Sequence, residues 1–387
     1  MTNLDLPKRF EEFADARKEG FLKVKAIKEQ GGKVAGIFCT FTPTEILDAA
    51  GLLTVGLCGM SDETINDAEV DLPKNLCPLI KSSYGYALTD KCPYTYFSDI
   101  IIGETTCDGK KKMYELLGEI KDTYIMQLPQ GVDRAYAPAM WEKEVRLLVK
   151  TLEKRFGVEI TDEKLRAAVE KRNHQRRLYN ELFDLGKLDP PPLKGFDMYK
   201  VIEGSGFLFD LEAGCKKLRE LIDQTREDYE LGNRPIPTGL KRILVTGCPI
   251  GGVLDKIVNT IESSGGVVVC FENCGGVKPA RHLVDESAED ITKAIAERYM
   301  KIGCSVMSPN IQRMEMLPEL LKEFKVDGVI EVVLQTCHPY SVEKWEIKQL
   351  VNDNGLPYMA IETDYSKTDL GQIRTRIAAF LEMEPMQ

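Results

Sequence analysis

The sequence predicts an α/β protein with two related parallel-sheet lobes, a helical insert between them, and a functional cleft where the lobes meet. Residues 327–334 form an apolar run that leads to Cys337 and then to the helical run 342–351, as is typical of a buried strand feeding a helix. Residues 98–107 have the same order, with an apolar run that reaches a Thr-Cys pair before the helical run 110–120. Open α/β sheets bind ligands beyond the carboxyl ends of their strands, so the two units predict thiols that face a common cleft in a Rossmann- or flavodoxin-like arrangement.

The first lobe is expected to span residues 1–138. Residues 8–30 place Phe10, Phe13 and further apolar residues at helical spacing, which predicts an amphipathic helix. A helix start is also expected at residues 42–45, where a proline and an acidic residue fall in the first turn. The other expected elements are strands at 33–39, 53–58 and 124–128, a strand before Cys107, and helices at 44–50, from 76 onward and at 110–120.

Residues 139–236 are expected to form the helical insert. Long charged helices are predicted at 141–156, 162–183 and 210–231, interrupted by the stiff proline-rich segment 188–193. No strand-like run occurs here, so the insert is either a clamp over the cleft or a purely structural spacer.

The second lobe, residues 237–387, is expected to repeat the order of the first. Strands are predicted at 242–248, 267–271, before Cys337 and at 358–361, with helices at 254–264 and 289–300. Cys39 and Cys248 then occupy equivalent places in the two lobes, as do Cys107 and Cys337. This positional repeat has no exact motif.

Composition and charge exclude several classes of protein. The chain has 387 residues and a net charge of −10, which offers no basic footprint for nucleic acid. No apolar run approaches the roughly 20 residues of a transmembrane helix, and the N-terminus lacks the apolar region of a signal peptide. We therefore expect a cytoplasmic protein that binds neither nucleic acid nor membrane.

The eleven cysteines are the unusual feature of the composition. A reducing cytoplasm disfavours disulfides, and the absence of any Cys-x-x-Cys excludes zinc ribbons, thioredoxin-like motifs and bacterial ferredoxin runs. Seven cysteines follow predicted strands, begin predicted helices or lie in a loop that can face the cleft, where a helix N-terminus favours the metal-binding thiolate. These candidate metal ligands are Cys39, Cys77, Cys107, Cys248, Cys274, Cys304 and Cys337.

The other four cysteines are expected to be inert. Cys92 precedes its strand and should lie at the opposite edge, Cys215 lies within a helix, and Cys270 lies inside a strand; Cys58 is ambiguous. Seven converging thiols favour an iron–sulfur cluster, because zinc needs four ligands and often uses histidine, of which this chain has three. His338, beside Cys337, is either a supporting residue of the metal site or a plain loop histidine.

Further polar residues allow two interpretations each. Glu272, Glu331, Glu362 and Asp364 follow or end predicted strands and are either proton donors or solvated loop carboxylates. Residues 110–112 are three lysines that either meet an acidic partner or form a solvated helix face, which is the favoured interpretation. No phosphate-binding loop of the Gly-x-x-x-x-Gly-Lys-Ser/Thr type is present, and no catalytic residue is assigned.

Several segments resemble the 2-hydroxyacyl-CoA dehydratase/benzoyl-CoA reductase family. They are residues 38–51, Leu76-Cys77-Pro78, Thr106-Cys107-Asp108-Gly109, residues 327–337 and residues 361–365. The resemblance spans nearly the whole chain, the insert least. It implies that Cys77, Cys107 and Cys337 hold a [4Fe-4S] cluster.

The chain is richer in cysteine than a dehydratase subunit needs. The segments 90–94, 247–252, 273–276 and 303–310 resemble the double-cubane-cluster branch of that family. This resemblance implies a homodimer in which six cysteines of each chain hold an [8Fe-9S] cluster, with electrons from an ATP-hydrolysing iron–sulfur activator. Six ligands among seven candidates leave at least one surplus, first Cys248 and next Cys39.

The sequence therefore predicts an anaerobic iron–sulfur oxidoreductase that reduces a small molecule at low potential. The first alternative is a 2-hydroxyacyl-CoA dehydratase subunit with a [4Fe-4S] cluster. The second is a non-enzymatic electron carrier. Neither the substrate, the dimer interface nor the role of the insert follows from the sequence.

Overall fold

The computed structural model describes residues 8–383 of the chain and the side chains of residues 19–383. The first helix, α1 (Lys8–Glu29), covers the predicted N-terminal helix, but Phe10 and Phe13 of its expected apolar face lie outside the described side chains. No described helix has both the length and the apolar composition needed to cross a membrane.

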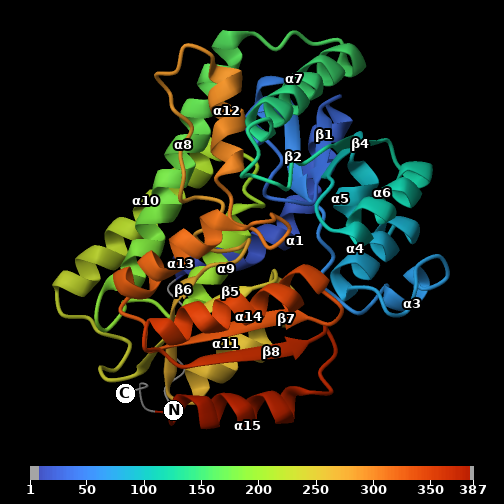
Figure 1. The fold of residues 1–387 in the computed structure, drawn as a ribbon. Coiled ribbons are helices and arrows are strands. Elements are labelled where there is room, and N and C mark those ends of the chain that lie inside the picture. The colour runs from blue at the N-terminus through green and yellow to red at the C-terminus, as the bar shows by residue number, and fades with distance from the viewer. Residues whose placement is uncertain (1–7, 384–387) are drawn as a thin grey trace.

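Two four-stranded sheets confirm the predicted pair of parallel lobes (Figure 1). The first sheet has the order β2-β1-β3-β4 and the second β6-β5-β7-β8, and every strand pair in both is parallel. Matching order makes β1 the counterpart of β5 and β3 the counterpart of β7. The strands are β1 (Lys33–Ile37), β2 (Leu52–Gly56), β3 (Ile100–Glu104), β4 (Thr123–Met126), β5 (Lys241–Gly247), β6 (Gly266–Phe271), β7 (Gly328–Leu334) and β8 (Tyr358–Thr363).

An aspartate at the start of each central strand extends this correspondence to single hydrogen bonds. Asp99, before β3, accepts from the backbone N–H of Val34 in β1 at 2.8 Å. Asp327, before β7, accepts from the N–H of Arg242 in β5, also at 2.8 Å. The weak repeat seen in the sequence is therefore a structural repeat of the two lobes.

Helices of the first lobe begin where the sequence supplies a turn and a proline or polar residue. Pro78 and Pro93 occupy first-turn positions, where the missing N–H of proline costs no hydrogen bond. The helices are α2 (Thr44–Ala49), α3 (Ile65–Ala68), α4 (Pro78–Leu88), α5 (Pro93–Phe97) and α6 (Asp108–Ile120).

The middle of the chain is helical, as predicted. Trp141, Val145, Leu148 and Leu152 recur at helical spacing and bury one face of the first of these helices, which ends at Gly157 with a φ of +65°. The sequence did not predict α9, which follows the proline-rich segment. The elements are α7 (Ala137–Phe156), α8 (Asp162–Asp184), the 3-10 turn Leu185–Lys187, α9 (Gly195–Ser205) and α10 (Leu211–Glu230).

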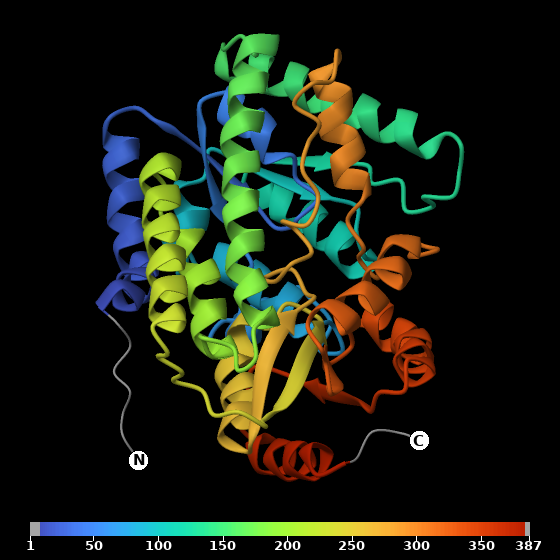
Figure 2. The ribbon, with the colours of Figure 1, turned by 90° about the vertical axis from the view of Figure 1, so that its left-hand side faces the viewer.

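The second lobe sends one helix back to the first. Helix α12 (Ile291–Met300) packs against α7 and α8, and Ile295 and Tyr299 share a buried core with Leu47 and Ile102 of the first lobe. Figures 1 and 2 show this orange helix beside the green α8, away from its own sheet. The remaining elements are the 3-10 turn Gly251–Val253, α11 (Leu254–Ser263), α13 (Ile311–Glu323), α14 (His338–Asp353) and α15 (Leu370–Leu381).

Candidate functional site

A large cavity lies at the carboxyl ends of the strands of both lobes. Its volume is about 2280 Å³, larger than the 300–1000 Å³ typical of a small-molecule pocket. Both lobes and the helices α8 and α9 contribute to its wall. The cavity is therefore roomy enough for a bulky cofactor together with a substrate.

Three thiols enter this cavity from helix N-termini. Cys77, Cys107 and Cys337 are the residues that precede α4, α6 and α14. The pKa of each thiol is raised, at Cys77 and Cys337 first by a neighbouring thiol and at Cys107 by burial, while backbone N–H groups of the first helical turn oppose the shift. The residues that the family resemblance singles out thus share one local geometry.

Backbone strain supports the placement of Cys337. Thr336, directly before it, has a φ of +57°, a left-handed conformation that a β-branched residue rarely adopts. Strained residues of this kind persist where the surrounding structure enforces them, and they cluster at functional sites.

The thiols interact with one another across the two lobes. Cys337 interacts with Cys77 of the first lobe and with Cys248 of its own. A second set interacts electrostatically, with Cys39 of the first lobe facing Cys274 and Cys304 of the second. Cys107 interacts with Cys77 of one set and Cys304 of the other, so the seven predicted thiols form one continuous group.

All seven predicted thiols line the cavity, and so do two that the sequence analysis set aside. The prediction that Cys92 lies at the opposite edge is wrong, because Cys92 precedes α5 and reaches the cavity from that helix start. The pair Cys92-Pro93 has the same form as Cys77-Pro78, and this signal was present in the sequence. Cys58 donates a hydrogen bond to the carbonyl of Phe38 at 3.1 Å and also lines the cavity.

Two cysteines remain outside the cavity, as expected. Cys215 is buried in α10, and Cys270 is buried in β6. All eleven cysteines are free thiols.

The donor set fits a polynuclear iron–sulfur cluster better than a single ion. Among the described residues, no three His, Cys, Asp or Glu side chains are arranged to hold one metal ion. Burial raises the pKa of the Cys39 and Cys107 thiols, so their thiolates need a nearby cationic group to form. An iron–sulfur cluster supplies such a group and takes thiolate ligands.

Two polar residues lie behind the thiols of the first lobe. Lys110 of α6 lines the cavity and donates to the carbonyl of Phe38 at 3.2 Å, so the prediction that it belongs to a solvated helix face is wrong. Thr42 also lines the cavity, and its hydroxyl donates to the fully buried Glu104. Burial raises the pKa of Glu104 to about 7, although Thr42 and Lys110 oppose the shift.

The second lobe holds a buried ion network that includes Glu272, directly after β6. Glu272 lies 3.0 Å from Lys278 and 3.2 Å from Arg313, and Arg313 lies 3.1 Å from Glu331, with all four side chains fully buried. The interpretation of Glu272 and Glu331 as solvated loop carboxylates is therefore wrong.

This network reaches the thiols through Tyr340. Its hydroxyl accepts from Lys278 at 3.2 Å and lies 4.0 Å from the sulfur of Cys304. The network therefore fixes one wall of the thiol group.

Comparisons with known proteins identify the family of this chain. The family model of the 2-hydroxyglutaryl-CoA dehydratase D-component matches residues 39–383. The chain is 51% identical over 380 residues to YjiM of Escherichia coli (strain K12), provisionally named a dehydratase subunit, with 98% of each chain covered. It is 26% identical to the (R)-phenyllactyl-CoA dehydratase beta subunit of Clostridium sporogenes, covering 93% of this chain and 94% of that one. It is 20% identical to one of the benzoyl-CoA reductase subunits of Thauera aromatica, with 90% of each chain covered. The chain, whose two parallel-sheet lobes enclose this thiol-lined cavity, therefore belongs to the 2-hydroxyglutaryl-CoA dehydratase D-component family.

Proposed function

We propose that this chain is a low-potential reductase of a small molecule and that its cavity thiols hold a double-cubane [8Fe-9S] cluster. The observation that carries the proposal is the number of thiols on one cavity wall. Nine of the eleven cysteines line it, whereas a single [4Fe-4S] cluster takes four ligands at most. When bound, the cluster would supply electrons at low potential.

The ligands would come from the seven interacting thiols. Cys77, Cys107 and Cys337 form the core of the set because helix N-termini stabilise their thiolates. Cys39, Cys274 and Cys304 complete six ligands, and Cys248 is the surplus thiol. The sulfur of Cys248 already accepts a hydrogen bond from the N–H of Leu334 at 3.4 Å, which suits a supporting role.

Partners and location follow from the same proposal. The chain has no phosphate-binding loop, so ATP hydrolysis would belong to a separate [4Fe-4S] activator, and the reductase itself would be a homodimer. Eleven free thiols accord with the reducing cytoplasm that the proposal requires.

The names of the relatives favour a second candidate, a subunit of a 2-hydroxyacyl-CoA dehydratase with one [4Fe-4S] cluster. The phenyllactyl-CoA and lactoyl-CoA dehydratase subunits match more than 90% of this chain. In this candidate the extra thiols have no ligand role.

Iron and acid-labile sulfide per chain, measured on anaerobically purified protein, distinguish the candidates. About eight irons per chain support the double cluster, and about four support the dehydratase. Zinc without sulfide would refute both. Reduction of a small acceptor only with the activator and ATP present separates the reductase from an electron carrier, which shows no such turnover.

A further inference from the structure

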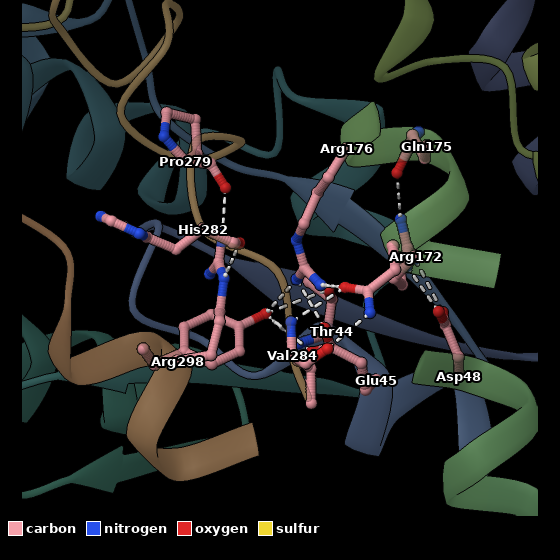
Figure 3. Close-up of polar contacts among 12 residues, drawn as sticks. Thr44, Glu45, Asp48, Arg172, Gln175, Arg176, Pro279, His282, Val284 and Arg298 are labelled. Atoms are coloured by element: carbon pink, nitrogen blue, oxygen red, sulfur yellow. Dashed lines mark hydrogen bonds and ion pairs between the residues drawn. The ribbon is translucent and has the colours of Figure 1, made fainter. Parts of the chain in front are cut away.

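The same cavity has a second polar wall, formed by three arginines (Figure 3). We call Arg172, Arg176 and Arg298 the guanidinium cluster. Arg172 and Arg176 lie one turn apart on α8, and Arg298 comes from α12. Like charges at this helical spacing repel, so the cluster needs anionic groups nearby.

Two carboxylates from α2 form ion pairs with two of these arginines. Asp48 receives a two-pronged ion pair from Arg172, with distances of 2.5 and 2.7 Å. The fully buried Glu45 lies 2.5 Å from Arg176. Tyr299 donates to the other oxygen of Glu45, at 2.8 Å.

Arg298 has no such partner. Its side chain is only 3% exposed, yet no Asp or Glu oxygen among the described residues lies within 4 Å of its guanidinium. It donates to the backbone carbonyls of Pro279 and His282. Burial and the positive charge of Arg176 together lower its pKa to about 10, although Tyr299 and Glu45 oppose the shift.

The cluster therefore carries three guanidinium groups against two carboxylates. Buried charge is costly unless it is paired, and the unpaired arginine lines a cavity open to small molecules. An anion that entered from the cavity would complete the pairing.

We propose that the guanidinium cluster binds an oxyanion, a carboxylate or phosphate group carried by a small molecule that enters the cavity. The planar fork of arginine matches both groups in two-pronged geometry. Gln175 lines the same wall and adds a neutral polar side chain.

The position of the cluster connects it with the thiols. The loop from Cys39 to Thr44 joins the two walls, and five residues span at most about 18 Å. Thr44 donates its backbone N–H to Tyr299 at 3.1 Å, directly beside the cluster. A molecule held by its oxyanion would thus occupy the same cavity as the thiols, and its identity as the reduced substrate rests on the proposed function.

Isothermal titration of the full chain with inorganic phosphate and with acetate tests the site. We expect Arg298→Gln to weaken binding by about ten- to hundredfold, since a hydrogen bond to a charged group contributes about 1.5–3 kcal/mol. The matched control is Arg242→Gln. Arg242 is a buried guanidinium bonded to backbone carbonyls, but it does not line the cavity. Equal weakening in both variants, or no binding by wild type, would overturn the site.

Competition experiments distinguish a phosphate group from a carboxylate group as the bound oxyanion. Displacement of phosphate by coenzyme A would indicate a phosphate-bearing tail, whereas displacement by acetate alone would indicate a carboxylate. If neither coenzyme A nor acetate displaced phosphate, the result would contradict the proposal. If Arg298→Gln does not fold, wild-type crystals soaked in selenate decide: the anomalous selenium peak should lie beside Arg298, and its absence there would overturn the site. All these measurements detect anion binding and not turnover. A failure of the oxyanion site can therefore be distinguished from a failure of the proposed function, which the iron content tests.

Discussion

Each lobe buries a pair formed by a threonine and a glutamate, but the surroundings of the two pairs differ. In the first lobe the hydroxyl of Thr42 donates to Glu104. Among the described residues no Lys or Arg nitrogen lies within 4 Å of Glu104, and its second oxygen has no hydrogen-bond partner. In the second lobe Thr246 donates to Glu272, which also lies within 3.2 Å of both Lys278 and Arg313.

The presence of these cations reverses the protonation of the carboxyl group. Burial raises the pKa of Glu104 to about 7. Burial acts on Glu272 too, but Lys278 and Arg313 outweigh it and hold the pKa of Glu272 below its ordinary range. Environments that push two carboxyl groups apart in this way separate a proton donor from a fixed charge. The first lobe thus buries a carboxyl group that keeps its proton up to about neutral pH, whereas the second buries a charged carboxylate within an ion network.

The largest expected effect is the loss of bound iron when a cysteine of either lobe is replaced. This experiment tests whether the two lobes contribute equally to metal binding. Cys107 and Cys337 follow equivalent strands, and each precedes a helix. We expect alanine at either position to remove most of the bound iron, because each thiol belongs to the one continuous group. Iron per chain after anaerobic purification checks this expectation. Cys215→Ala, a buried thiol outside the cavity, is the control and should retain its iron.

Full iron retention in one of the two variants would show that the two lobes do not contribute equally to metal binding. It would assign the metal to a single lobe and would contradict a shared site.

A second test compares one lysine from each lobe. Lys278→Met leaves the buried Glu272 with one cation fewer and should lower the free energy of unfolding by about 3–5 kcal/mol. Lys110→Met removes a hydrogen bond to a carbonyl and should cost only about 1 kcal/mol. Urea denaturation of the metal-free proteins measures both. Similar losses would mean that the second lobe gains no extra stability from its ion network.

The strands and helices of the two lobes could be predicted well because short, continuous stretches of sequence determine them. The apolar runs before Cys107 and Cys337 and the helix starts after them appear in the structure as β3, β7, α6 and α14. Buried parallel strands read as continuous apolar runs, so these segments allow few other interpretations.

The parts that the sequence did not predict depend on distant packing. Arg298 follows an ordinary helical pattern, and only the return of α12 to the first lobe places it on the cavity wall. Glu272 and Glu331 resemble loop carboxylates in sequence, because their partner Arg313 lies on a helix that the sequence analysis did not predict. Cys92 is the exception, because the Cys-Pro pair that marks its helix start is local.

A third test uses the pH dependence of stability. The folded pKa of Glu104, about 7, lies above its ordinary value of 4.5, so the folded state binds the proton more tightly than the unfolded state. The stability from Glu104 is full below about pH 4.5 and is lost as the pH rises toward 7, a change on the order of 3 kcal/mol. Glu104→Gln should therefore gain stability relative to wild type between pH 5 and pH 8, measured by urea denaturation.

Glu272→Gln provides the contrasting control. The depressed pKa of Glu272 places its titration below 4.5, so its difference from wild type should stay constant between pH 5 and pH 8. Glu262, whose pKa burial also raises to about 7, is present in all three proteins, so its contribution cancels. A Glu104→Gln difference that does not change with pH would show that Glu104 is not the titrating group.

The smallest expected effect concerns the aspartates that begin the central strands. Asp99→Ala and Asp327→Ala each remove the acceptor for one backbone N–H of the neighbouring strand, which should cost about 1–3 kcal/mol. Asp99 also pairs with the partly exposed Lys28 at 2.7 Å, and such pairs contribute at most about 1 kcal/mol. The two variants should thus differ by less than about 1 kcal/mol in urea denaturation, with Asp99→Ala the less stable. A larger difference, or a greater loss at Asp327, would mean that the repeated hydrogen bond does not have the same role in the two lobes.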